Sequence, residues 1–337
     1  MFTKLGIEAP VIQAPMAGVS TAELTAAIAN AGGLGFVALG TFSVADASAV
    51  LDKTHALTDR PFGVNLFCHE PARRDFEHEA EWLQLLGPEF DRFSAKPPAE
   101  LHEMYPSFRV HDDLLSLLIE RRPPVISFHF GLPRADQLQA LKETGAILLA
   151  TATNVQDAQR IAQAGLDGIV AQGWQAGGHR GVFDPVDPAR DEQMETLTLL
   201  EKLREVGLPL IAAGGIMTAG DRRAAMQAGA SAVQCGTAFL LAPEAATSPD
   251  HRARLTSTKT QMTRAISGRP ARGLINRLMQ LDEARAAAYP MAYDAAKALS
   301  AAAMARGDHS YAAQWAGTGA AHAVARPAAQ TLAAISG

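Results

Sequence analysis

The sequence predicts an α/β protein of the (β/α)8 TIM-barrel class, and three observations carry this prediction. Eight short apolar runs alternate with longer helical patterns along roughly the first 240 residues. The runs are apolar throughout and do not alternate with polar residues, as expected for parallel strands covered by helices. Polar and glycine residues gather just after the runs, where the active sites of barrels lie. A doubly wound open sheet is the alternative, because strand order cannot be read from a sequence.

A predicted helix follows each of the first seven predicted strands. The strands are expected at 11–16, 34–39, 62–67, 125–130, 146–152, 167–172, 208–213 and 232–239. The helices are expected at 21–31, 44–57, 111–121, 134–143, 155–164, 195–205 and 219–228, the first of them capped by Ser20 or Thr21. The order breaks between His69 and Pro106, in a charged, aromatic stretch that we interpret as a helical insertion after the third strand.

These elements divide the chain into two predicted parts. Residues 1–245 are expected to form the barrel, with the insertion at 69–110. Residues 246–337 are expected to form a C-terminal helical segment packed on the barrel mouth. This segment is rich in Ala and contains Tyr289, Tyr293, Lys297, Tyr311 and Trp315.

Composition excludes several classes of function. The net charge of −5 argues against a nucleic-acid or anionic-membrane partner, because phosphate binding depends on clustered Lys and Arg. Two cysteines, Cys68 and Cys235, rule out a disulfide scaffold or a Cys-rich zinc site, and no metal site is expected. No apolar run reaches the roughly 18 residues that span a bilayer, and no signal-peptide core precedes the first strand. A cytoplasmic protein is therefore expected.

Two glycine clusters indicate a phosphate site. Gly214-Gly215 and Gly236-Thr237 follow the seventh and eighth strands. In barrels this is the usual phosphate position, where backbone N–H groups and a helix N-terminus face the anion. Each pair could instead only shape a tight turn. Two pairs on adjacent strands favour phosphate binding.

The loop after the sixth strand contains the candidate catalytic residue. Gly177-Gly178-His179-Arg180-Gly181 places a histidine, the side chain best suited to moving protons near neutral pH, at the barrel mouth. Arg180 is either a partner for a substrate or cofactor anion or a solvated loop charge. Asn65 and Gln172 end buried strands, where amides bond either a planar heterocycle or the neighbouring backbone. We interpret His129 as a satisfied core histidine, and both cysteines as packing residues.

The sequence lacks the motifs of several common sites. It has no triphosphate-binding loop, no zinc-protease helix and no hydrolase serine elbow. Gly32-Gly33-Leu34-Gly35 precedes a strand instead of following one, so it is no dinucleotide fingerprint. Flavin mononucleotide (FMN) fits the phosphate site, the amides and the histidine together. These features alone do not distinguish it from another phosphorylated ligand.

The chain resembles the nitronate monooxygenases, formerly called 2-nitropropane dioxygenases, and among them the class I type. The glycine–histidine loop and the motif after the eighth strand are fairly specific for this flavin group. The fourth-strand motif and the insertion favour class I. The matching segments span nearly the whole chain and comprise residues 13–18, 30–35, 61–67, 127–133, 172–181, 214–216 and 234–240.

The resemblance implies a barrel that binds FMN without covalent attachment. It implies oxidation of alkyl nitronates, such as propionate 3-nitronate, by O2 to a carbonyl compound and nitrite or nitrate, with His179 as the catalytic base. The expected partners are therefore a small nitronate and O2, and a homodimer is the one assembly considered. The resemblance places the cofactor at Ala14, Pro15, Met16, Asn65, Gln172, Gly177, Gly178, Gly214, Gly215, Gln234, Cys235, Gly236 and Thr237. It places the substrate pocket at Tyr105, Tyr289, Tyr293 and Lys297.

Two departures and two alternatives accompany this interpretation. Trp174-Gln175 stands where many members have an acidic residue, which points to altered loop polarity and substrate range, and Cys235 stands where Leu is common. The main alternative is an FMN-dependent NAD(P)H reductase of the enoyl-thioester or quinone type on the same barrel. The other is a non-catalytic binder of a phosphorylated ligand, since one fold hosts many functions.

Overall fold

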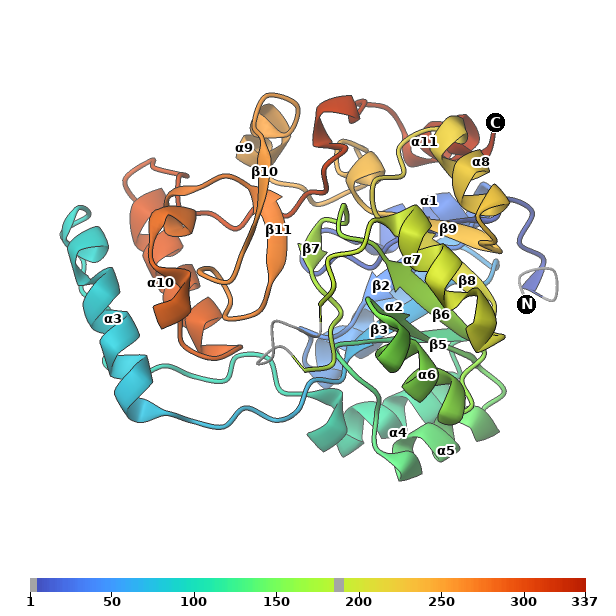
Figure 1. Cartoon of the computed structure of the whole chain (residues 1–337), viewed down its shortest axis with the longest axis horizontal. Coiled ribbons are helices and arrows are strands. Elements are labelled where there is room, and N and C mark those ends of the chain that lie inside the picture. The colour runs from blue at the N-terminus through green and yellow to red at the C-terminus, as the bar shows by residue number, and fades with distance from the viewer. Residues whose placement is uncertain (1–4, 185–190) are drawn as a thin grey trace.

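The computed structural model describes residues 5–184 and 191–337, and its centre is a barrel of eight parallel strands (Figure 1). The strand order is β1-β9-β8-β6-β5-β4-β3-β2. The (β/α)8 prediction is confirmed. The strands are β1 (Val11–Gln13), β2 (Phe36–Ala38), β3 (Gly63–Phe67), β4 (Val125–His129), β5 (Ile147–Ala152), β6 (Gly168–Gln172), β8 (Leu210–Ala213) and β9 (Ala232–Cys235).

Seven helices connect the barrel strands at the predicted places. The first begins after Thr21, whose Oγ1 accepts a hydrogen bond from the backbone N–H of Leu24 at 2.9 Å. The last strand is shorter than predicted, because the chain turns at Gly236 into a 3-10 helix at Thr237–Phe239. The helices are α1 (Ala22–Asn30), α2 (Val44–Leu57), α4 (Asp112–Arg121), α5 (Ala135–Glu143), α6 (Val155–Gln163), α7 (Thr196–Leu203) and α8 (Ala219–Gln227).

A side chain completes the seam between the first two strands. The backbone N–H of Gln13 donates to the carbonyl of Leu34 at 3.0 Å, just before β2 begins. Further along, the side-chain Oε1 of Gln13 accepts from the N–H of Phe36 at 3.0 Å, and its Nε2 donates to Ser20 Oγ at 2.8 Å. Gln13 is fully buried, so its amide replaces a ladder hydrogen bond where β1 and β2 diverge. This seam closes the barrel and rules out the open sheet.

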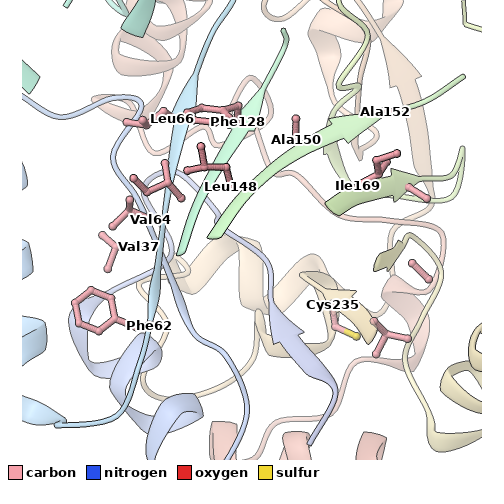
Figure 2. Packing of buried hydrophobic residues seen from close by; sticks show 14 of the residues in the cluster. Val37, Phe62, Val64, Leu66, Phe128, Leu148, Ala150, Ala152, Ile169 and Cys235 are labelled. Carbon is pink, nitrogen blue, oxygen red and sulfur yellow. The ribbon is translucent and has the colours of Figure 1, made fainter. Parts of the chain in front are cut away.

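Alternate residues of the strands pack on two sides. One cluster lies between the strands and the outer helices, and Figure 2 shows Val64 and Leu66 of β3 beside Phe128 of β4 and Leu148 of β5. The other cluster takes residues only from the strands and their immediate flanks, and fills the barrel interior. Both sets are apolar because neither face of the sheet meets water. The interior set is Ile12, Leu34, Phe36, Val125, Leu149, Val170, Ile211, Ala213 and Ala232.

The insertion and the C-terminal segment form a second core beside the barrel. Helix α3 (Phe76–Asp91) of the insertion packs on α10 (Met291–Met304), and both lie on one side of the barrel in Figure 1. Trp82 and Tyr311 are among the buried residues of this core. The hydroxyl of Tyr311 donates to the carboxylate of Glu89 and accepts from Arg277 Nε at 2.9 Å. The bond between Tyr311 and Glu89 joins residues 222 positions apart in the chain.

The sequence analysis expected a helical segment after residue 245, but this segment is not helical throughout. It contains α9 (Pro249–Arg254), α10 and α11 (Ala328–Ser336), but also strands β10 (Thr260–Thr263) and β11 (Ala271–Leu274). With β7 (Gly178–His179), these strands form a small antiparallel sheet. Helix α11 packs on α1 and α8 at the barrel wall, and it also contacts the 3-10 helix at Thr237–Phe239. The division at residue 245 stays a prediction. Within the described ranges, no helix is long and apolar enough to cross a membrane.

The barrel seam generates a stability prediction. Gln13→Leu removes the acceptor for the buried N–H of Phe36, and we expect the free energy of unfolding to fall by about 2 kcal/mol. Chemical denaturation measures this change. Gln139→Leu, at an exposed position of α5, is the matched control and should change the free energy by less than about 0.5 kcal/mol. Equal effects of the two substitutions would contradict the role of Gln13.

Candidate active site

A cavity of about 610 Å3 opens at the carboxyl ends of the barrel strands. Ends of β1, β3, β4, β6, β8 and β9 form its wall together with the loop of β7 and residues from the C-terminal segment. All the cofactor and substrate-pocket residues expected from the sequence line this one cavity, as does His179. The volume falls in the range of small-molecule and cofactor sites. The individual roles of the predicted cofactor, substrate-pocket and catalytic residues stay predictions.

His179 is held by both its backbone and its ring. It lies in β7 opposite Ala271 of β11, and its Nε2 is 2.8 Å from Ser267 Oγ. Ser267 Oγ donates to the carbonyl of Arg269 at 3.2 Å and accepts from the Arg269 N–H at 3.3 Å. The single hydroxyl proton is thereby used, so this network assigns the proton of the pair to Nε2 of His179. Its Nδ1 keeps a lone pair and is the basic atom of the ring.

The surroundings of His179 keep its ring neutral. Burial lowers its pKa to about 3, and the nearby His129 and Arg269 act in the same direction. Aromatic rings enclose it, with the centroid of Trp315 at 5.1 Å and that of Phe130 at 5.6 Å. A neutral imidazole among aromatic rings keeps a lone pair that can accept a proton, as a general base must.

His129 faces the cavity but has both ring nitrogens satisfied. Its Nε2 donates to the carbonyl of His179 at 3.2 Å, and its Nδ1 is 3.0 Å from the hydroxyl of Thr151. The first bond fixes Nε2 as the protonated nitrogen, so Thr151 donates to Nδ1. Burial lowers the pKa of His129 to about 4. This geometry fits the interpretation of His129 as a histidine whose ring nitrogens are both hydrogen-bonded. The side chain also lines the cavity, and its bond to the carbonyl of His179 supports the glycine–histidine loop.

Glycine is required where the glycine–histidine loop, residues 177–181, meets the C-terminal segment. A Cβ atom at Gly177 would lie 2.4 Å from the backbone nitrogen of Gly317, so any side chain at this position would clash with the backbone. Gly178 has a φ of +75°, in the left-handed region that favours glycine. The two glycines therefore allow the loop to pass against residues 316–317 and then enter β7.

The predicted phosphate end is a cradle of backbone donors. Gly214 and Gly215 have φ values of +113° and +75°, which turn the chain sharply after β8. No hydrogen bond within the described residues uses the backbone N–H of Gly215 or Gly236. Thr237 Oγ1 accepts from the N–H of Gly317 at 2.9 Å, so its hydroxyl proton is available to a ligand. This donor set suits an anion.

The two strand-end amides differ in how they are used. Gln172 Nε2 donates to the carbonyl of His179 at 2.9 Å, and its Oε1 accepts from the N–H of Gly181 at 2.8 Å. Gln172 thus holds the glycine–histidine loop at residues 179 and 181. Of the two partners that the sequence offered for this amide, a planar heterocycle or the neighbouring backbone, the structure shows the backbone. Asn65 Nδ2 donates to Ser127 Oγ at 2.8 Å. Cys235 also lines the cavity, but burial raises the pKa of its thiol to about 12, so it acts as a small packing residue.

One sequence-based expectation for this loop was wrong. Arg180 is neither a ligand partner nor a solvated charge. It is fully buried and pairs with Asp191, with Nη2 and Oδ1 2.7 Å apart. Gln175 is not among the residues that line the cavity, and its Oε1 accepts from the N–H of Thr196 at 2.9 Å. The altered loop polarity and substrate range expected from the departure at residues 174–175 stay predictions.

The predicted substrate residues meet beside His179. Lys297 Nζ contacts the hydroxyl of Tyr105 and lies 5.0 Å from its ring centroid and 5.5 Å from that of Tyr293. The Tyr293 ring is 6.2 Å from that of His179. Burial raises the pKa of Tyr289 and Tyr293, so both hydroxyls are protonated. Among the described residues, Lys297 is the only Lys or Arg in the lining, and no Asp or Glu lines it.

Sequence reasoning missed several residues that shape the site. Trp315, Phe130, Ser248 and His251 line the cavity, and Ser267 holds His179. Phe130 has a φ of +73°, a strained conformation for a bulky residue, of the kind that clusters at functional sites. Phe130 lies in the Ser-Phe-His-Phe-Gly motif, which was a usable signal. The others come from a segment that was expected to be helical and carried no motif.

The fold and the cavity define a TIM-barrel enzyme whose site combines a neutral histidine with an anion cradle. Comparison with known proteins gives the family. The family model described as nitronate monooxygenase matches residues 1–335. A nitronate monooxygenase of Paraburkholderia phytofirmans is 48% identical, over 98% of this chain and 92% of the relative. One of Pseudomonas aeruginosa is also 48% identical, over 98% of this chain and 96% of the relative. The chain belongs to the nitronate monooxygenase family and is an oxidoreductase.

Solved structures agree with this placement. Nitroalkane oxidase from Streptomyces ansochromogenes has a TM-score of 0.90 and 35% identity, covering 99% of this chain and 97% of that one. FabK from Thermotoga maritima has a TM-score of 0.75 and 26% identity, covering 99% and 93%. Among the residues described, no group of His, Cys, Asp and Glu could hold a metal ion.

The buried neutral histidines generate a pH prediction. His129 and His179 have pKa values of about 4 and 3 in the folded chain, below the ordinary value of about 6.5 in the unfolded chain. Their contribution to stability is complete above pH ~6.5 and is lost as the pH falls toward 4, by at most about 1.4 kcal/mol per pH unit for each group. Urea unfolding at several pH values measures the slope.

A variant separates this effect from general acid denaturation. His129→Gln removes one of the groups, so its unfolding free energy should depend less steeply on pH between about 6.5 and 4. His322→Gln, at an exposed position, is the matched control. An unchanged slope in His129→Gln would contradict the assignment of a buried neutral imidazole.

Proposed function

We propose that this chain is an FMN-dependent nitronate monooxygenase. It oxidises alkyl nitronates, such as propionate 3-nitronate, by O2 to a carbonyl compound with release of nitrite or nitrate. The reaction balances as one nitronate and one O2 giving nitrate, or two nitronates and one O2 giving two nitrites. The observation that carries the proposal is a single cavity that combines a neutral histidine, an anion cradle and one lysine, with no carboxylate among its described lining residues.

The lining residues fit FMN. The backbone N–H groups of Gly215 and Gly236 and the hydroxyl of Thr237 suit its phosphate. Ala14 and Met16 lie directly beside this cradle, since a Cβ atom at Gly236 would be 3.5 Å from both Ala14 Cβ and Met16 Sδ. The flavin, when bound, accepts electrons from the nitronate.

His179 supplies the proton chemistry. A neutral nitroalkane must lose an α-proton to become a nitronate, and Nδ1 of His179 is the lone-pair nitrogen that accepts it. Ser267 holds Nε2 of the same ring, which keeps the tautomer fixed during the transfer. The rings of Phe130 and Trp315 pack beside the imidazole. A preformed nitronate needs no such base.

Lys297 attracts anions to this end of the cavity. It is the sole cation of the described lining, and it is tethered by Tyr105 and Tyr293. Propionate 3-nitronate carries a carboxylate as well as the nitronate group, so a cation near His179 favours it over nitronates with uncharged tails.

The visible spectrum of the purified protein, recorded before and after anaerobic addition of propionate 3-nitronate, tests the proposal. We expect a flavin spectrum that changes on addition, because electrons pass from the nitronate to the cofactor. A flavin untouched by nitronate but bleached by NADH or NADPH would establish the reductase alternative. A protein that retains no flavin would contradict both.

His179→Asn tests the base. We expect oxidation of neutral nitroethane to fall at least about 100-fold, because its α-proton must leave. Oxidation of preformed ethyl nitronate should fall less than about tenfold. Steady-state O2 consumption with each substrate measures both rates, and flavin content is the control for folding. Equal losses on the two substrates would overturn the base role.

Lys297→Met tests the anion site. We expect the KM for propionate 3-nitronate to rise about tenfold, and the KM for ethyl nitronate, which lacks the carboxylate, to change less than about twofold. Lys297→Arg keeps the charge and should restore most of the affinity. The same rise in KM for both substrates would show that Lys297 does not recognise the carboxylate.

A further inference from the structure

A buried arginine lies behind the aromatic rings that surround His179. Arg269 stands between β10 and β11, is only 3% exposed, and is not among the residues that line the cavity. Burial lowers its pKa to about 10, so its guanidinium is a cation at neutral pH. Neither the sequence motifs nor the proposed mechanism uses this side chain. Because it does not line the cavity, it acts on the reaction through the groups around it.

The guanidinium contacts the same two rings as the imidazole. Its Cζ lies 4.3 Å from the ring centroid of Phe130 and 5.8 Å from that of Tyr289. The Phe130 ring stands edge-on to the imidazole of His179, with centroids 5.6 Å apart and an interplanar angle of 89°. The centroid of Tyr289 is 5.9 Å from that of the same imidazole. A change in the position of the guanidinium therefore reaches His179 through one ring.

Phe130 is a residue that needs such support. Its φ of +73° is unfavourable for a bulky side chain, and strained residues persist only where their surroundings hold them. A guanidinium over an aromatic face is attracted by the ring, and this attraction is stronger where water is excluded. The stacked guanidinium thus helps to keep Phe130 in the orientation that it has beside His179.

The same side chain holds the backbone beyond the histidine. Nη2 of Arg269 donates to the carbonyl of Val182, one residue after the glycine–histidine loop. The backbone N–H of Arg180 donates to the carbonyl of Pro270 at 2.8 Å. The side-chain bond therefore continues the pairing of the two chain segments past β7. A single guanidinium supports both a ring neighbour of His179 and the strand that carries it.

Packing alone does not account for an arginine at this position. Its Nε is buried and has no hydrogen-bond partner among the described residues. A buried cation with an unmet hydrogen bond costs stability, and an apolar side chain of similar size fills the same space at a lower cost. An apolar side chain would supply neither the stacking on Phe130 nor the bond to Val182.

We propose that Arg269 is a positioning residue for proton transfer from a neutral nitroalkane to Nδ1 of His179. In this step the α C–H bond breaks, its electron pair passes into the nitro group to give the nitronate, and the proton ends on Nδ1. Arg269 fixes the ring and the backbone of His179 in the place that this transfer requires. The inference rests on the proposed function of His179 as the base. A preformed nitronate has no α-proton to transfer to the base, so its oxidation does not depend on Arg269.

Steady-state O2 consumption with nitroethane and with ethyl nitronate tests this role. Arg269→Met keeps an unbranched side chain and removes the guanidinium, and we expect kcat/KM for nitroethane to fall about tenfold, because a misplaced base slows proton transfer. The value for ethyl nitronate should stay within about twofold of wild type. The isotope effect with α-deuterated nitroethane should be at least as large as in wild type. Arg306→Met, at an exposed position of the same C-terminal segment, is the matched control and should change none of these quantities.

Two further variants show how Arg269 acts. Arg269→Lys keeps the charge but has no planar group to stack on Phe130, so we expect the same selective loss. In a Phe130→Leu background, Arg269→Met should lower kcat/KM for nitroethane by less than about threefold, because the ring through which Arg269 acts is gone. Flavin content and the thermal midpoint check folding, and Arg269→Lys carries the comparison if Arg269→Met does not fold.

The outcomes separate this inference from the proposed function. Equal losses on the two substrates, or a smaller isotope effect, would show that Arg269 does not serve proton transfer. Full activity of Arg269→Lys, or an undiminished loss in the Phe130→Leu background, would show that it does not act by stacking on the ring. Each of these results overturns the inference. Wild-type protein that holds no flavin, or that oxidises neither substrate, would overturn the proposed function itself.

Discussion

The pairing of β7 with β11 is the constraint on which the site depends. It places Ala271 opposite His179 and Arg272 opposite Gly178, so part of the glycine–histidine loop is one strand of a sheet. The carbonyl of His179 then accepts from both Gln172 and His129, which tie the strand to the barrel. A loop that leaves β6 is thereby fixed between the barrel and the C-terminal segment. The geometry of the imidazole follows from backbone hydrogen bonds on both sides.

The described lining of the cavity contains few charged side chains. Its histidines and tyrosines are ionisable groups that burial keeps neutral, and the described lining contains no carboxylate. An anionic ligand therefore meets hydrogen-bond donors and one lysine without a competing negative charge. Arg180, the charge that the sequence placed closest to the site, instead binds Asp191 and the carbonyls of Gln172 and Gly173 inside the wall. These bonds of the buried guanidinium stiffen the loop. Because its charge is paired with Asp191, Arg180 contributes little to the electrostatic potential in the cavity.

The barrel could be predicted because each of its elements has a local signature, such as the apolar run of β6 or the cap of α1 at Thr21. The lining residues at strand ends could be predicted because strand ends converge in a barrel, whereas Tyr105, Tyr289, Tyr293 and Lys297 were predicted from the family resemblance. The small sheet could not, since β7 has two residues and β10 and β11 have four each, too few for a periodic pattern. The partners of Arg180 and His179 could not either, because Asp191 and Ser267 lie in segments without motifs. Those contacts are set by tertiary packing alone.

The last helix has a consequence for how the protein is made. Helix α11 packs on α1, and the methyl groups of Leu332 lie so close to Gly33 that a Cβ atom there would be 2.7 Å away. Arg222 of α8 donates to the carbonyls of Ile335 and Ser336 at 3.0 and 2.6 Å. The wall beside the β1–β2 seam is thus covered by a helix that is synthesised long after the seam itself. A nascent chain leaves that apolar surface exposed until α11 has been made, and chaperones would bind it during this interval.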